Sequence, residues 1–231
     1  MVNRVSGPRD VVVCAAGSMP GDLHKLWRTR DPKGYHVEYG FSCMGYEIAG
    51  GLGIKMADPE REVFVMVGDG SYLMMAQELA TAVQEGVKLT VVLVQNHGFA
   101  SIGALSESVG SQRFGTRYRY RNPETGALDG ELLPVDLAAN AASLGARVLR
   151  AATVAEFEAA LREAAAADVT TVVEVQTDPL AGAPSSEAWW DVPVAEVSSL
   201  DTTQAARADY ERHKATQRPY LTPAHRVEST P

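Results

Sequence analysis

The stretch VFVMVGDGSYLMMAQELATAVQEGVKLTVVLVQNHGF, residues 63–99, decides the fold. It contains an apolar strand, a GDGS turn, a helical segment and a second apolar strand that ends before Asn96. Two strands joined by a helix are expected to be parallel, and parallel strands end at the same edge of a sheet. Asp69 and Asn96, 27 positions apart, are therefore predicted to meet at the carboxyl edge, where open α/β sheets bind ligands.

The same alternation runs through the rest of the chain. Further strands are predicted at 11–17, 35–40, 147–151 and 170–177, and helices at 23–30, 44–57, 72–86, 154–167 and 200–217. This pattern predicts an α/β fold, a doubly wound, mostly parallel sheet with helices on both faces. Residues 97–134 lack a clear period, which is typical of a functional or mobile loop. We expect a ligand-binding domain at 1–178 and a tail with one helix at 179–231.

Composition narrows the class of protein. The chain has 231 residues, 45% of them hydrophobic, and a net charge of −8, which disfavours nucleic acid and anionic membrane surfaces as partners. The N-terminus carries charges where a signal peptide has an apolar run, and the longest apolar runs have the length of strands. A cytoplasmic protein is expected. Cys14 and Cys43 lack CxxC spacing and are expected to be buried free thiols.

The GDGS turn and Asn96 supply oxygen ligands. A carboxylate at Asp69, an amide oxygen at Asn96 and a backbone carbonyl just beyond would suit Mg²⁺, which takes its remaining oxygens from water and phosphates. Gly68 and Gly70 are expected to allow positive φ and close backbone approach, and the helix start beyond them favours an anionic diphosphate. For Asp69 alone, a helix cap is the competing interpretation.

GDGS followed by Asn96 resembles the cofactor motif of the thiamine diphosphate superfamily that includes acetolactate synthase and pyruvate decarboxylase. The resemblance implies that Asp69 and Asn96 bind Mg²⁺ through their side chains and Gly98 through its carbonyl. It also implies that Gly68, Gly70 and Ser71 lie at the diphosphate of thiamine diphosphate. Position 97 is His where many relatives have a second Asn, so its role is open.

Two earlier segments resemble other parts of the same cofactor site. AAGSMPGD, residues 15–22, is similar to the second diphosphate-facing turn, which would place Gly17 and Ser18 there, with a helix cap as the alternative for Ser18. EYGFSCMGYEIAGGLG, residues 38–53, is similar to the pyrimidine-binding segment. Met44 would then support the bent cofactor, and Ser42 and Met44 would contact the aminopyrimidine through their backbone. Ordinary core packing is the alternative for Met44.

Residues 15–51, 95–116 and 185–198 narrow the resemblance to the family of hydrolases that open the ring of a trihydroxycyclohexane-1,2-dione in myo-inositol catabolism. The part that is similar is their C-terminal domain. The resemblance implies thiamine diphosphate and Mg²⁺ as cofactors, a small polyol-derived dione as substrate and 5-deoxyglucuronate as product. Trp189 and Trp190 are open between covering the site and packing within the tail.

The resemblance also implies a partner. In the superfamily the acid that activates the aminopyrimidine is a Glu of a pyrimidine-binding domain in a neighbouring subunit, and Glu38 and Glu47 are not expected to replace it. We therefore expect a homo- or hetero-oligomer in which a pyrimidine-binding domain or subunit completes the site. The alternatives are a subunit of a two-chain 2-oxoacid decarboxylase or acetolactate synthase-like enzyme, and an inactive fragment. Asp69→Ala is expected to abolish cofactor binding and leave the fold intact.

Overall fold

The computed structural model describes residues 1–184 and 188–218. The described residues form a six-stranded sheet in the order β2-β1-β3-β4-β6-β5, and every neighbouring pair is parallel. The strands are β1 (Val11–Cys14), β2 (Tyr35–Val37), β3 (Val63–Gly68), β4 (Thr90–Gln95), β5 (Arg147–Ala151) and β6 (Thr171–Gln176). All six strands lie within the ranges predicted from the sequence, because β-branched runs bounded by turn residues mark buried parallel strands clearly.

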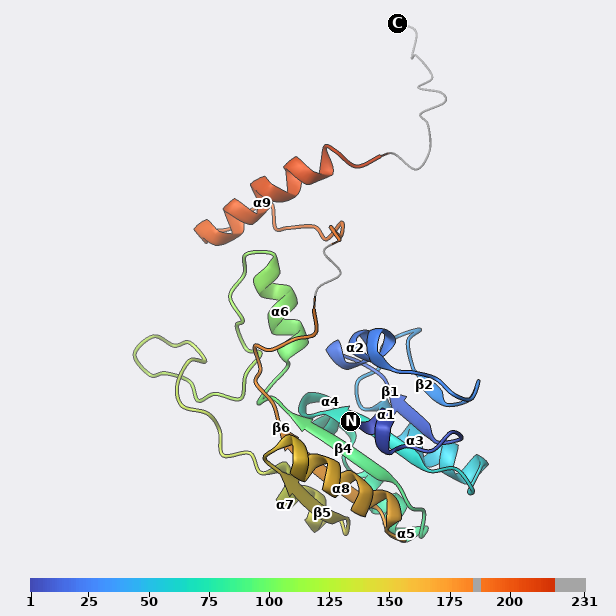
Figure 1. Ribbon diagram of the computed structural model, residues 1–231. Coiled ribbons are helices and arrows are strands. Elements are labelled where there is room, and N and C mark those ends of the chain that lie inside the picture. The colour runs from blue at the N-terminus through green and yellow to red at the C-terminus, as the bar shows by residue number, and fades with distance from the viewer. Residues whose placement is uncertain (185–187, 219–231) are drawn as a thin grey trace, which may run out of the picture. The chain divides into compact units, whose positions relative to one another are not determined.

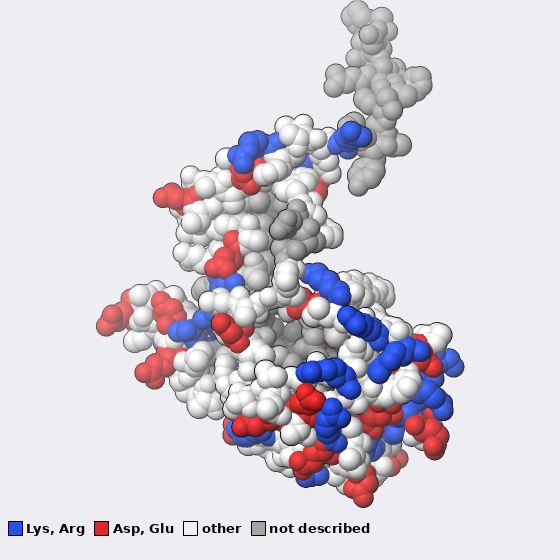
Figure 2. Space-filling model, in the orientation of Figure 1, with Lys and Arg blue, Asp and Glu red and all other residues white. Residues whose placement is uncertain are grey.

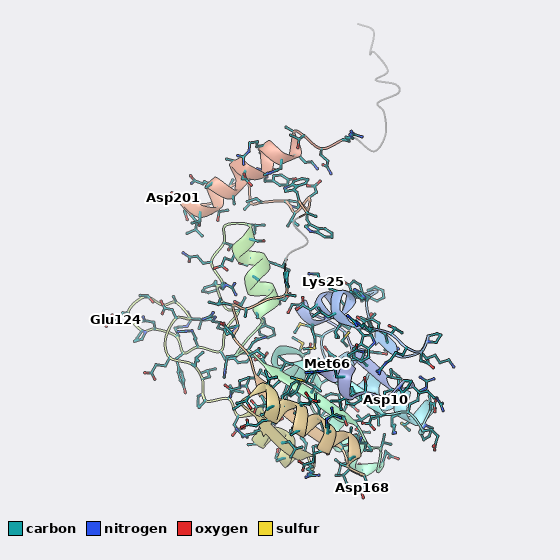
Figure 3. All side chains as sticks on the ribbon, viewed as in Figure 1. Asp10, Lys25, Met66, Glu124, Asp168 and Asp201 are labelled. Carbon is teal, nitrogen blue, oxygen red and sulfur yellow. The ribbon has the colours of Figure 1, made fainter. Side chains whose placement is uncertain are left out.

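Helices cover both faces of this sheet (Figure 1). The helices of the described residues are α1 (Val2–Val5), α2 (Ser18–Leu26), α3 (Tyr46–Ala57), α4 (Asp69–Met75), α5 (Glu78–Gln84), α6 (Ala100–Ser108), α7 (Leu137–Ser143), α8 (Val154–Ala166) and α9 (Asp201–Lys214). Side chains of α3, α4, α5 and α7 pack with Val63 and Val65 on one face, and those of α1 and α8 pack with Phe64 on the other. Met66 of β3, labelled in Figure 3, is partly buried against the second cluster. The predicted doubly wound α/β fold is confirmed.

The strand order reverses beside β1. The chain passes from β1 to β2 on one side and then crosses to β3 on the other, so β1 and β3 are neighbours in the sheet. Register pairs Gly68 at the end of β3 with Val94 near the end of β4. The turns that follow β1, β3 and β4 therefore leave one edge at adjacent positions, and this reversal is where doubly wound sheets bind ligands.

Several helices differ from the sequence prediction. The helix predicted at 72–86 is two helices, α4 and α5, and α2 begins at Ser18, earlier than predicted. Helix α6 lies inside the stretch 97–134 that had no clear period; its large apolar residues are Ile102 and Leu105, too few for the stripe that reveals a helix in sequence. The short helices α1 and α7 were also not predicted.

The chain divides into two compact units. The first comprises Met1–Gly103 and Phe114–Pro184, and the second comprises Ala104–Arg113 and the C-terminal residues from 185 onward. Within the second unit, the hydroxyls of Thr202 and Thr203 donate to the carbonyl of Gly110 at 2.7 and 2.9 Å. The parts of the predicted tail at 185–187 and 219–231 lie outside the described residues.

The two tryptophans also belong to the second unit. The ring of Trp189 lies 6.2 Å from that of Tyr210 and 5.9 Å from that of His213, both on α9, so it packs within the tail. Trp190 is 71% exposed.

Cys14 and Cys43 are both free; Cys14 is buried as predicted, but Cys43 is exposed because it lies in the turn before α3 and outside the core. On the face shown in Figure 2, basic and acidic side chains are interspersed. No helix among the described residues is long and apolar enough to cross a membrane.

Candidate functional site

Asp69 links the turn after β3 to the turn after β4. Its side chain is almost completely buried, with 1% exposed. Its Oδ1 accepts the N–H of Gly70 at 3.0 Å, and its Oδ2 accepts the N–H groups of Asn96 at 3.2 Å and Gly98 at 3.0 Å. The helix-cap interpretation of Asp69 is wrong, because Gly68 occupies the cap position of α4 and the carboxylate reaches the neighbouring loop. The predicted meeting of the two strand ends is confirmed by these bonds.

The surroundings of Asp69 favour a cation. Burial raises the pKa of Asp69 above the usual carboxyl range, and the backbone N–H groups of Gly98, Asn96 and Gly70 offset part of that rise. Among the described residues, its recorded partners are backbone N–H groups and no basic side chain forms an ion pair with it. A buried carboxylate without a positive partner is costly, and a bound cation would remove that cost.

Asn96 presents an unpaired oxygen. Its Oδ1 is buried and has no hydrogen-bond partner among the described residues. A buried amide oxygen in this state costs about 1–3 kcal/mol unless a ligand satisfies it.

His97 has a positive φ of 60°, and its ring lies 3.4 Å from the side chains of Gln95 and Gln176. The His97 ring therefore contacts the side chains of Gln95 and Gln176.

The glycines of GDGS do not have the positive φ that the sequence predicted. Gly68 is extended, with φ −80° and ψ 158°, and Gly70 lies within α4, so neither has the predicted positive φ. Gly70 is required for close packing instead. A Cβ there would lie 2.7 Å from the ring of Phe99 and 3.3 Å from Cε of Met44. Met44 thus packs against the GDGS turn, just before α3 begins at Tyr46.

Glu47 joins three segments that the sequence predicted separately. The side chain is 1% exposed, and its Oε2 accepts the N–H of Gly45 at 3.0 Å. Its carboxyl also hydrogen-bonds to the side chain of Ser71 and to the backbone of Ala16, while burial raises its pKa. Sequence reasoning gave Glu47 no such role. The available signal was a single acidic residue in the first turn of a mostly apolar helix.

The turn after β1 lies beside this group. Gly17 occupies the cap position of α2 with φ 91°, and Ser18 is the first residue of the helix. No side chain caps α2, so the cap interpretation of Ser18 is wrong. Ala16, the residue before Gly17, is linked to the GDGS turn through Glu47.

Glu38 shapes the segment that contains Ser42. Its carboxylate accepts the N–H groups of Phe41 at 3.1 Å and Cys43 at 2.6 Å, and these bonds lower its pKa. Ser42 is exposed and has φ 53°, an unusual conformation for a residue with a side chain. Glu38 therefore stabilises the tight turn that precedes Met44.

The predicted residues fall into two groups. Direct contacts join Asp69, Gly70, Asn96, Gly98 and Met44. The other predicted residues are linked to this group through Glu47, through Glu38 or along the chain. They are Gly17, Ser18, Ser42, Gly68 and Ser71. In the described part of the chain, no cluster of three or more His, Cys, Asp or Glu side chains is arranged to hold a metal. A metal here would depend on amide and carbonyl oxygens as well as one carboxylate.

A parallel sheet whose strand order reverses beside a buried carboxylate defines an α/β ligand-binding domain. The chain belongs to the family described as thiamine pyrophosphate enzyme, C-terminal TPP binding domain, whose model matches residues 15–175.

Curated relatives include 3D-(3,5/4)-trihydroxycyclohexane-1,2-dione hydrolase 2 of Bacillus cereus, 46% identical over 85% of this chain and 30% of the relative. A hydrolase of the same name from Bacillus anthracis is 44% identical over 89% of this chain and 32% of the relative. The chain thus spans about a third of the length of the curated relatives it matches.

Solved structures give the same fold. The thiamine diphosphate-dependent 4-hydroxybenzoylformate decarboxylase of Rhodococcus jostii matches with a TM-score of 0.64 over 77% of this chain and 31% of that one. At 20% sequence identity, this likeness concerns the fold alone.

Proposed function

We propose that this chain anchors thiamine diphosphate through Mg²⁺ in an enzyme that opens the ring of a trihydroxycyclohexane-1,2-dione by hydrolysis. The observation that carries the cofactor site is the contact between the buried Asp69 carboxylate and the Asn96 turn. The reaction and the substrate rest on the identity of 44–46% to dione hydrolases over most of the chain.

The donor set suits Mg²⁺. Asp69 supplies an anionic oxygen, and Asn96 supplies a buried amide oxygen that has no partner among the described residues. The Gly98 carbonyl is the proposed third protein ligand. Mg²⁺ prefers hard oxygen ligands, and it usually keeps positions in its shell for water and phosphate oxygens. The residues present therefore fit the ion that the family implies.

The adjacent turns suit a diphosphate. A Cβ at Gly17 or at Gly68 would meet no described atom within 4 Å, so both turns leave space beside their backbone. Ser18 begins the nine-residue helix α2, whose free N–H groups favour an anion. A diphosphate next to the Asp69 carboxylate would be repelled unless a divalent cation lay between them. Binding is therefore expected to require Mg²⁺.

Other residues would hold the rest of the cofactor. Met44 packs beside Gly70 and is proposed to support the bent cofactor, with Ser42 and Met44 contributing backbone groups to its pyrimidine ring. Ser71 is proposed to lie at the diphosphate, oriented by Glu47. When bound, thiamine diphosphate supplies a carbon nucleophile for the ketone carbonyl and an electron sink for cleavage of the C–C bond.

A pyrimidine-binding domain or subunit is proposed to complete the site. Glu38 and Glu47 both bind the N–H groups of their own segment, so neither carboxylate is free to serve the aminopyrimidine. The curated relatives are about three times as long as the part matched here, which leaves room for such a domain. An assembly of two or more chains is part of this proposal.

The test is turnover of the dione by these 231 residues alone and after addition of the N-terminal part of a Bacillus relative. We expect negligible hydrolysis alone and clear hydrolysis with the added part. Hydrolysis by the residues alone at the rate of a complete enzyme would contradict the need for a partner. Release of CO₂ from 2-oxoacids, with no hydrolysis of the dione, would favour the decarboxylase alternative.

A further inference from the structure

Tyr118 places an unpaired hydroxyl beside the candidate cofactor site. It lies in the loop after α6, and its hydroxyl is buried with no hydrogen-bond partner among the described residues. Its backbone N–H donates to the carbonyl of His97 at 3.1 Å, and its own carbonyl accepts the N–H of Leu133 at 2.8 Å. These bonds fix the residue next to the 96–98 turn.

The ring of Tyr118 is held as firmly as its backbone. It meets the ring of Phe99 edge to face, with 6.0 Å between centroids. Phe99 in turn is the side chain that crowds Gly70 in the GDGS turn. Tyr118 therefore belongs to the same packed group as Gly70 and Met44.

The Tyr118 hydroxyl is available as a hydrogen-bond donor. A tyrosine hydroxyl carries its proton at neutral pH, so this O–H can donate. A buried O–H without an acceptor costs about 1–3 kcal/mol. Asn96 Oδ1 is a second unpaired buried atom, and its residue is bonded to the same carboxylate. Among the described residues, the Tyr118 hydroxyl is thus a donor without an acceptor, and Asn96 Oδ1 is an acceptor without a donor.

We propose that the Tyr118 hydroxyl donates a hydrogen bond to an oxygen of the magnesium diphosphate group held by Asp69 and Asn96. This assignment rests on the proposed function, because it needs the cofactor in that position. Such an acceptor is anionic or bound to the metal, and a hydrogen bond to it is stronger than one between neutral groups. Tyr118 would then contribute a hydrogen bond to cofactor binding from a fixed position.

Tyr118→Phe tests the assignment because it removes the hydroxyl and keeps the ring against Phe99. Tyr120→Phe is the matched control, since Tyr120 lies two positions along the same loop and is 52% exposed. Each protein is titrated with thiamine diphosphate and Mg²⁺ in a calorimeter, and its unfolding by urea is measured without cofactor.

We expect Tyr118→Phe to weaken cofactor affinity about tenfold or more while its unfolding midpoint without cofactor stays equal or rises. Tyr120→Phe should change neither value. Unchanged affinity in Tyr118→Phe, beside normal binding by the original chain, would overturn this proposal alone. A loss of stability without cofactor that matches the loss of affinity would also overturn it, because the hydroxyl would then have a structural partner such as a buried water. Failure of the original chain to bind would overturn the cofactor site together with this proposal.

Discussion

Gly98→Ala is expected to destabilise the fold strongly, because the loop that crosses the candidate site has no room for a side chain there. A Cβ at Gly98 would lie 2.2 Å from the carbonyl oxygen of Thr116 and 2.8 Å from Cα of Arg117. Both atoms belong to the backbone, so no side-chain rotation relieves the clash. Gly98 also has φ 155°, which residues with a side chain rarely adopt.

The expected loss combines two costs. Overpacking and an unfavourable backbone conformation each cost about 1–3 kcal/mol, so the sum is about 2–6 kcal/mol out of a typical total of about 5–15 kcal/mol. Gly115→Ala is the matched control, in the loop after α6. Gly115 has φ 67°, but a Cβ there meets no described atom within 4 Å, so only the backbone cost of about 1–2 kcal/mol applies.

Urea unfolding of the two alanine variants measures this difference directly. Gly98→Ala should also lower cofactor affinity, because the Gly98 N–H donates to Asp69. Equal losses of unfolding free energy in the two variants would refute the argument, since it depends on the backbone contact at Gly98 that Gly115 lacks.

Two further outcomes follow from the buried polar groups. Asp69→Ala should lower the unfolding free energy by several kcal/mol, because each of three N–H groups left without an acceptor costs about 1–3 kcal/mol. Asn96→Ala should change the urea midpoint little, because its Oδ1 has no partner among the described residues. Burial raises the pKa of the Glu47 carboxyl above the ordinary glutamate value. Protonated Glu47 therefore favours the folded state below the ordinary glutamate pKa, and this stabilisation is lost as pH rises through the raised pKa. Urea midpoints at a series of pH values should therefore fall with rising pH relative to those of Glu47→Gln; the opposite slope would contradict this.

The loss of stability expected here for Asp69→Ala differs from the sequence-based prediction that this variant keeps its fold. A motif identifies Asp69 as a ligand but does not reveal that its carboxylate also joins two loops. Asn96→Ala is the better probe of metal binding, because its Oδ1 has no partner that the fold would lose.

The strands and the meeting of Asp69 with Asn96 were predictable because they depend on local patterns. Apolar β-branched runs mark buried strands, and one helix between two strands leaves them parallel. The order of the strands was not predictable in the same way, because it depends on which faces pack together in three dimensions. Helix α6 was missed because Ile102 and Leu105 are its large apolar residues, and two such residues form too short a stripe to recognise.

The details of the site depended on contacts between distant segments. Positive φ occurs at His97 and Gly98, where the loop bends toward Asp69, and not in the GDGS turn. The link that Glu47 makes to Ser71 crosses 24 positions of sequence, and the packing of Tyr118 beside Phe99 depends on a long loop folding back. Spacing within a motif carries no information about such contacts.

The proposed metal site is tested by the affinity of thiamine diphosphate for the chain, measured with Mg²⁺ and after a chelator has removed the metal. Calorimetry should detect binding with Mg²⁺ and none without it, because the Asp69 carboxylate would repel an unbridged diphosphate. Asn96→Ala should weaken the binding that Mg²⁺ supports. Equal affinity with and without the metal would contradict the proposal that Asp69 and Asn96 hold the ion that anchors the cofactor.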